Sequence, residues 1–256
     1  MNLKSNIKIY ENALQASIEV AQHITSIIQK NESVGKPTVL GLATGNTPLL
    51  VYKELVRLYH EKQVSFQKVI TFNLDEYYPM APHHPQSYVA FMKKHLFDHI
   101  DIDWKNVHIP NGELITDDIP LFCKAYEDKI VAAGGLDFQL LGIGRTGHIG
   151  FNEPESSLES LTRLVDLNPI TREDAIADFN GLNNVPKQAI SMGVQTIYKA
   201  KEIMLLAFSE KKSDIIQKAI QEEVNPQVPA SYLQKHPNIT YILDNESASK
   251  LKKQLS

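Results

Sequence analysis

The sequence predicts an α/β fold of three layers, a Rossmann-like arrangement in which helices flank both faces of a mostly parallel sheet. Short apolar runs alternate along the chain with longer amphipathic stretches, which is typical of such folds. The length of 256 residues allows one large domain or two small ones. Because no internal repeat or low-complexity linker divides the chain, we expect a single domain over residues 1–256.

The individual elements follow from hydrophobic periodicity. The first helix is indicated by apolar residues at steps of three and four positions, namely Leu14, Ile18, Ala21, Ile24 and Ile28. Further helices are expected at Pro48–Glu61, Pro120–Ala133 and Lys211–Glu223. The expected strands are Thr38–Ala43, Val69–Leu74, Val107–Ile109, Phe138–Gly142, Glu202–Phe208 and Thr240–Leu243. The least regular region, Glu155–Pro186, is either a surface excursion or a mobile cover over a site.

Composition excludes several classes of protein. A net charge of −4 gives no electrostatic reason to expect nucleic acid or an anionic membrane as partner. The single cysteine, Cys123, excludes an internal disulfide and a cysteine-rich metal site. The first residues lack an apolar signal core, and no segment approaches the ~20 apolar residues that span a bilayer. We therefore expect a cytoplasmic enzyme or binding protein.

The most informative segment is the run from Leu140 to Pro154, in which an apolar stretch ends in a glycine-rich turn that carries His148. Glu153 follows five residues later. An imidazole titrates near neutrality, and a nearby carboxylate sets its tautomer and raises its basicity. The segment thus indicates proton transfer at a sheet edge, although a tight turn with a packed histidine would give the same pattern.

A second segment, Gly41–Leu50, predicts a strand, a short polar turn and a helix. Thr47 stands at the expected N-cap and Pro48 at the first helical position. Such a turn presents backbone N–H groups and hydroxyls at the positive end of a helix, which suits a phosphate. Its glycine spacing matches neither the Walker loop nor the dinucleotide fingerprint, so an ordinary cap without a ligand is the alternative.

A third segment ends an apolar strand with two carboxylates, Asp75 and Glu76. If the chain stays extended, these side chains point to opposite faces, so only one can face a crevice at the carboxyl end of the strand. Partial desolvation there would raise the basicity of that carboxylate. The alternative is that the acids cap the next loop.

Two weaker signals complete the survey. Lys211 follows the apolar stretch Ile203–Phe208 and could reach an anionic ligand from the end of that strand. His83 and His84 precede a proline and are expected in a solvated turn. No second set of histidines and carboxylates has metal-ligand spacing, so we expect no metal.

Taken together, these segments resemble the glucosamine-6-phosphate deaminase family, within the larger group of sugar-phosphate isomerases and 6-phosphogluconolactonases. The likeness runs from about Val39 to about Asn238. The ending Phe-Asn-Glu-Pro favours the deaminases, because the related turn of the lactonases lacks that acid. The matching motifs are Ala43–Pro48, Phe72–Tyr77, His84–Tyr88, Gly147–Pro154 and Val185–Ala189.

The resemblance implies conversion of glucosamine 6-phosphate and water into fructose 6-phosphate and ammonia, with no cofactor. It makes His148 the ring-opening base with Glu153 as partner, and Asp75 the base that removes the C2 proton. The phosphate would be held by Lys211 and by the loop residues Thr44, Gly45, Asn46 and Thr47.

The sequence departs from the family pattern at three places. Thr146 stands where many members carry an acid two residues before the histidine; it can hydrogen-bond the imidazole but cannot stabilise its cation as a carboxylate would. Ala177 lies near the position of a phosphate-binding arginine, for which Arg172 is the candidate substitute. Val165 stands where a lysine of the N-acetylglucosamine 6-phosphate effector site is expected, although Ser156, Ser157 and Arg163 match that site.

Two alternatives stay open. Nothing in the sequence reads the C4 hydroxyl, so galactosamine 6-phosphate is a second candidate substrate. Thr146 also allows a sugar-phosphate sensor that kept the fold and lost catalysis. The expected partner is a small amino-sugar phosphate, and the resemblance allows a homo-oligomer.

Overall fold

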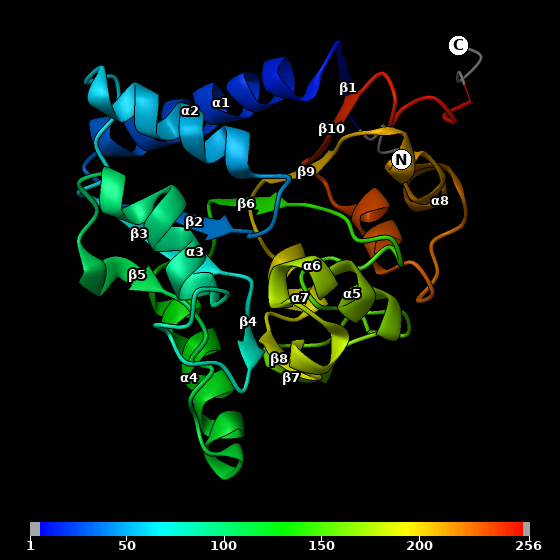
Figure 1. The fold of residues 1–256 in the computed structure, drawn as a ribbon. Helices are drawn as coiled ribbons and strands as arrows, with labels where there is room; N and C mark the ends of the chain where they lie inside the picture. Colours follow the sequence, from blue (N-terminus) through cyan, green and yellow to red (C-terminus); the bar gives the residue numbers. More distant parts are fainter. Residues whose placement is uncertain (1–5, 253–256) are drawn as a thin grey trace.

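The computed structural model describes residues 6–252 and contains a seven-stranded sheet whose pairings are all parallel (Figure 1). The strand order is β1-β10-β9-β6-β2-β3-β5. Parallel strands need crossover connections, and the helices between them supply these. In chain order the strands are β1 (Asn6–Tyr10), β2 (Thr38–Leu42), β3 (Val69–Asn73), β5 (Val107–His108), β6 (Phe138–Leu141), β9 (Ile203–Ala207) and β10 (Ile239–Asp244).

Helices cover both faces of this sheet, which confirms the predicted three layers. One face packs against α1 (Ala13–Ser33), α2 (Leu49–His60) and α3 (Tyr88–His95). The other packs against α4 (Ile119–Ala132), α7 (Val194–Tyr198) and α8 (Ser213–Gln221). Along β9, Met204 and Leu206 join the first core and Leu205 joins the second. The strands are therefore buried on both sides, as their continuous apolar runs predict.

Helix α1 shows how the core selects one face of a periodic stretch. Asn12 caps it, since its side chain accepts a hydrogen bond from the Gln15 N–H at 3.0 Å. The buried stripe runs through Ala16, Val20, Ala21, Ile24 and Ile28. Leu14 was expected on that stripe but is 54% exposed; the buried stripe begins at Ala16.

A second, antiparallel sheet of three strands was not predicted. Its order is β4-β8-β7, with β4 at Asp75–Tyr78, β7 at Arg163–Asp166 and β8 at Gln188–Ser191. The chain enters it directly from β3 through Leu74, whose N–H still bonds Leu42 and whose carbonyl accepts from Met192. The three strands are short and partly polar, so no apolar alternation marks them in the sequence.

The region Glu155–Pro186 is ordered into β7, α5 (Pro169–Asp174), α6 (Ile176–Phe179) and a 3-10 turn. Asn168 caps α5, and Ala175 and Phe179 pack into a small apolar cluster with Tyr77 and Phe151. The region therefore folds into regular elements, and Figure 1 shows β7, α5 and α6 there. That it moves over a site stays a prediction.

Other differences concern element ends and short elements. The predicted strands and helices all occur, mostly with ends shifted by one or two residues, whereas β1, α3, α5, α6 and α7 were not predicted. The 3-10 turns are Phe97–His99, Trp104–Asn106, Thr116–Asp118, Leu182–Asn184, Glu210–Lys212 and Pro229–Lys235. Within residues 6–252, every helix is too short or too polar to cross a membrane.

Candidate active site

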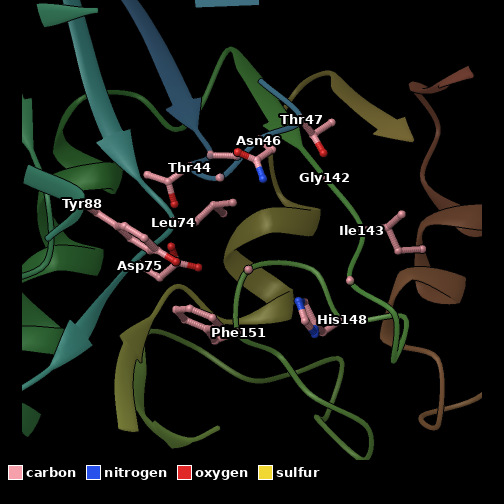
Figure 2. A pocket seen from close by; sticks show the side chains of 14 residues that line it. Thr44, Asn46, Thr47, Leu74, Asp75, Tyr88, Gly142, Ile143, His148 and Phe151 are labelled. Carbon is pink, nitrogen blue, oxygen red and sulfur yellow. The ribbon is translucent and has the colours of Figure 1, made fainter. Parts of the chain in front are cut away.

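A cavity of about 160 Å³ lies where the carboxyl ends of β2, β3 and β6 meet (Figure 2). Ligands of open α/β sheets bind at this edge. The cavity brings together three of the segments that the sequence singled out. It is lined by Ala43, Thr44, Gly45, Asn46, Thr47, Leu74, Asp75, Tyr88, Gly142, Ile143, Gly144, His148, Gly150 and Phe151.

The loop between β2 and α2 forms one wall of the cavity. Its polar residues Thr44 to Thr47 all line the space. The expected cap is wrong in one detail: Pro48, not Thr47, is the N-cap residue, and no side chain bonds the helix N-terminus. Because α2 begins one residue late, at Leu49, the Thr47 hydroxyl is not used as a cap and borders the cavity instead. The buried Tyr52 hydroxyl, in α2, donates to the Ala43 carbonyl and so anchors the start of the loop to that helix.

Asp75 begins β4 and points into the cavity (Figure 2). The residue is 5% exposed, and its carboxylate makes no hydrogen bond within the described residues. Burial, with a smaller contribution from the charge of Glu76, raises the pKa of Asp75 to about 8. Gly150, at φ +57°, lies against this carboxylate, and a Cβ there would come within 3.3 Å of Oδ2. The site therefore holds a carboxyl group of raised basicity.

Glu76 points away from Asp75, as alternation along a strand predicts. Its carboxylate accepts hydrogen bonds from the backbone N–H groups of Tyr88, at 2.8 Å, and Val89, at 3.2 Å, at the start of α3. Burial raises the pKa of Glu76 to about 7, against the opposing effect of these hydrogen bonds. Of the two acids, one thus borders the cavity and the other caps a helix.

His148 enters the cavity from a turn that only glycine can close. The Gly144 N–H donates to the His148 carbonyl at 3.1 Å. A Cβ on Gly144 would lie 2.1 to 2.5 Å from atoms of the imidazole, so the ring occupies the space that any larger residue would need. Figure 2 shows Asp75 and His148 on two sides of the same space, with Phe151 beside them.

Behind the imidazole lies a network of one carboxylate and two hydroxyls. His148 Nδ1 is 3.2 Å from Glu153 Oε2 and 2.9 Å from the Thr146 hydroxyl. Thr146 donates to Glu153 Oε2 at 2.9 Å, and Thr171 donates to Oε1 at 2.5 Å. Burial alone would raise the pKa of Glu153, but His148 and the two hydroxyls lower it below its usual value. Thr171 was not predicted, because it comes from α5, outside the motif.

Of the two lysines that follow β9, Lys212 lies against the wall of the cavity. Lys211 is exposed, whereas the Lys212 ammonium donates to the Ile143 carbonyl in the cavity wall at 2.8 Å. Burial lowers the pKa of Lys212. Lys211 and Lys212 are consecutive residues of the 3-10 turn Glu210–Lys212, so their side chains project about 120° apart and only one of them can face inward. Sequence position alone did not distinguish the two.

Arg172 lies in α5 and faces away from the cavity. Its guanidinium donates to the carbonyls of Leu182, Val185 and Pro186 at 3.0 to 3.2 Å, which closes the following loop. Arg145, next to Gly144, instead pairs with Asp174 of α5 at 2.7 Å.

A larger cavity of about 730 Å³ adjoins the first and shares five lining residues with it, Gly45, Asn46, Tyr88, Gly144 and His148. Its far wall comes from α5 and α6, through Thr171, Asp174, Ala175, Asp178 and Phe179. The irregular region of the sequence therefore borders the approach to the site. His83 and His84 lie in an exposed turn, and within residues 6–252 no group of three or more His, Cys, Asp or Glu side chains is placed to hold a metal ion.

Arg163 forms hydrogen bonds with neighbouring side chains of the same chain. Its guanidinium donates to the buried Asn152 side chain at 2.9 Å and to the Ser156 hydroxyl at 3.2 Å. Asn152 also donates to the carbonyls of Ile149 and Met192 at 2.8 Å. These contacts fix the loop that carries Glu153 to the second sheet.

Known proteins resemble the chain over nearly its whole length. It is 48% identical to a glucosamine-6-phosphate deaminase of Clostridium botulinum (strain Langeland) over 234 residues, which covers 91% of this chain and 95% of the relative. It is 46% identical to the enzyme of that name from Thermoanaerobacter pseudethanolicus, with 90% of each chain covered.

Solved structures agree. A monomeric glucosamine-6-phosphate deaminase superposes with a TM-score of 0.91 at 38% identity, covering 95% of this chain and 99% of the other. A 6-phosphogluconolactonase from Trypanosoma cruzi, at 21% identity, shares the fold with a TM-score of 0.77. The sequence model described as glucosamine-6-phosphate isomerases/6-phosphogluconolactonase matches residues 11–242. The chain therefore belongs to the glucosamine-6-phosphate isomerase/6-phosphogluconolactonase family.

Proposed function

We propose that this protein is a glucosamine-6-phosphate deaminase, which converts glucosamine 6-phosphate and water into fructose 6-phosphate and ammonia. The observation that carries the proposal is one cavity with a carboxyl group of raised pKa, Asp75, on one side and a carboxylate-backed imidazole, His148, on the other. The relatives at 46–48% identity bear the same name.

The imidazole of His148 opens the sugar ring. A closed pyranose must lose the proton of its anomeric hydroxyl while the ring oxygen gains one, and an imidazole can carry both transfers near neutral pH. Glu153 and Thr146 lie on the Nδ1 side of the ring. Nε2 is therefore the nitrogen that takes and returns the proton.

Asp75 moves the proton between C2 and C1. Once C1 is an aldehyde, the C2 proton is acidic enough to be removed by a carboxylate, which leaves an enolamine. O1 takes up a proton from solvent as the enolamine forms. The same carboxyl then delivers its proton to C1, which leaves an iminium at C2; water adds to that carbon, ammonia leaves as the ketone forms, and one proton returns to solvent. Oxidation at C2 is matched by reduction at C1, so the reaction has no net redox change. The raised pKa of Asp75 suits a group that must both accept and return a proton.

The loop Thr44–Thr47 receives the phosphate, with Lys212 as the cation. One ammonium proton of Lys212 is bonded to Ile143, which leaves two for an anion. Lys212 is bonded to Ile143, and the preceding residue, Gly142, lies next to the loop: a Cβ built on Gly142 would be 3.7 Å from the Thr47 hydroxyl. The lysine and the loop therefore flank the same part of the cavity wall. Binding the phosphate orients the reacting carbons through energy remote from them.

The direct test is a coupled assay of ammonia and fructose 6-phosphate with purified protein and the two epimeric amino-sugar phosphates. We expect turnover of glucosamine 6-phosphate. Turnover of galactosamine 6-phosphate alone would correct the substrate. Binding of either sugar without exchange of its C2 proton in deuterated water would show a sensor instead.

Asp75→Asn should abolish exchange of the C2 proton with solvent, because the amide cannot accept it. The dissociation constant for glucosamine 6-phosphate should stay within about threefold of the parent value. Isotope exchange followed by NMR and calorimetric binding check these outcomes. Equal losses of exchange and of binding would indicate a structural role for Asp75.

The same variant should stabilise the fold at high pH. Since the pKa of Asp75 rises on folding from 3.8 to about 8, the folded chain binds more protons than the unfolded chain between these values. Ionised Asp75 therefore destabilises the native state increasingly as pH rises through this window. Thermal unfolding should show a higher Tm for Asp75→Asn at pH 8 and matching values near pH 4.

Glu76→Gln should move the acid limb of the kcat/KM profile to lower pH. The charge of Glu76 raises the pKa of Asp75, and the base works only when deprotonated, so removing that charge keeps Asp75 active in more acidic solution. The glutamine oxygen can still accept from the Tyr88 N–H and cap α3. A profile unchanged from that of the parent would show that Asp75 does not control this limb.

Lys212→Met should raise KM for glucosamine 6-phosphate by about tenfold with little change in kcat, because it removes a charge that binds ground and transition states alike. Lys211→Met is the matched control: it removes the same charge from an exposed neighbour and should leave KM within about twofold. Steady-state kinetics of both variants decides the assignment. A larger effect at Lys211 would restore the lysine that the resemblance implies.

A further inference from the structure

Thr171 contacts the catalytic pair from a different part of the chain. Thr171 lies in α5 and is 8% exposed. Its hydroxyl is 2.5 Å from Glu153 Oε1 and 3.4 Å from His148 Nδ1. We infer that Thr171 is a positioning residue that, through Glu153, keeps the proton of the neutral His148 imidazole on Nδ1. The inference deepens the proposed function, since it concerns the base that opens the ring.

The placement of protons follows from counting donors. A threonine hydroxyl has one proton and two lone pairs. Thr146 and Thr171 each donate that proton to Glu153, one to each carboxylate oxygen. Toward His148, both hydroxyls can then only accept, and so can Glu153 Oε2. Three acceptors therefore surround Nδ1, which favours the tautomer with its proton on Nδ1 and a free lone pair on Nε2.

Each hydroxyl has a separate part in this arrangement. Thr146 bonds Oε2, the oxygen next to the imidazole, whereas Thr171 bonds Oε1, the far oxygen. A carboxylate held at one oxygen can still rotate about its terminal bond, while one held at both cannot do so without losing a bond. Thr171 therefore fixes the plane of the Glu153 carboxylate. That plane sets the direction from which Oε2 accepts the hydrogen bond of His148 Nδ1. A base oriented by a third group is the usual arrangement in acid–base catalysis.

The charged side chains around the cavity are engaged elsewhere, so the positioning of Glu153 depends on the two threonine hydroxyls. Asp75 lies across the cavity, Arg145 is paired with Asp174, and Lys212 is bonded to the Ile143 carbonyl. Within residues 6–252, none of these four groups hydrogen-bonds His148 or Glu153. Phe151, the aromatic neighbour of the imidazole at 6.4 Å between ring centroids, offers no proton.

Thr171→Val tests the inference, because it keeps the volume and removes the hydroxyl. We expect kcat for glucosamine 6-phosphate to fall about tenfold and KM to change less than about twofold. In protein labelled with ¹⁵N-histidine, the ring-nitrogen shifts of His148 should move toward the Nε2–H tautomer. The His148 signals are assigned by their loss in His148→Gln.

Two further variants separate the hydroxyl from the fold. Thr171→Ser restores the donor and should recover most of kcat and the parent tautomer. Thr196→Val is the matched control, since Thr196 is also buried and donates to a carboxylate, Glu127 Oε1, at 2.6 Å, but lies outside the cavity. It should lower stability while leaving kcat and the His148 shifts at the parent values.

Asp174→Asn distinguishes positioning from a loosened helix. It weakens the pairing of α5 with Arg145 without touching Glu153. If it reproduces the tautomer shift of Thr171→Val, or if Thr171→Val leaves the His148 signals and kcat unchanged, the inference is overturned. The NMR comparison needs no substrate, so a parent protein that releases no ammonia would refute the proposed function and still leave the role of Thr171 decided.

Discussion

The burial of one unpaired carboxyl group is the constraint around which this site is arranged. Asp75 is 5% exposed, and its side chain makes no hydrogen bond within residues 6–252. A buried, unpaired carboxylate destabilises the folded state unless it takes up a proton, and for this reason burial raises the pKa of Asp75 to about 8. Two features keep it in place: β4 pairs with β8 on one side, and Gly150 leaves room for its oxygen atoms. The rest of the fold offsets the cost.

Both sheets hold side chains that line the cavity. The parallel sheet supplies the carboxyl ends of β2, β3 and β6, whose loops surround the cavity. The antiparallel sheet receives the chain as it leaves β3 and fixes the direction of Asp75. It also anchors the Glu153 loop, since the Phe151 N–H donates to Ser191 of β8 at 3.0 Å. The acid and the imidazole thus share one small sheet as a common support.

Threonine at position 146 has a physical interpretation in this setting. A second carboxylate next to Glu153 would add like charge to a partly buried site, whereas a hydroxyl donates to Glu153 and lowers its pKa. Thr171 completes the same pattern from α5. The carboxylate is therefore stabilised by neutral donors. The region Glu155–Pro186 contributes one of them, so it takes part in the site as well as bordering it.

Much of the fold could be read from the sequence, because continuous apolar runs and periodic helices report burial directly. The order of strands and the second sheet could not, since β4, β7 and β8 are short and their pairing depends on partners far away in the chain. The candidates Asp75, His148, Glu153 and Thr44 to Thr47 were found because each follows a strand or lies in a glycine-rich turn, where side chains gather at the sheet edge.

What only the tertiary structure decided is the direction in which each group points. Lys212 rather than Lys211 meets the cavity wall, because neighbouring residues of a 3-10 turn point in different directions and the turn sets which of them faces inward. Arg172 closes a loop through backbone carbonyls, although its position in the sequence resembled that of an anion ligand. Thr171 reaches Glu153 only because α5 packs against the loop that carries His148 and Glu153. Local sequence determines which residues carry chemistry, whereas contacts between distant segments determine which of them meet.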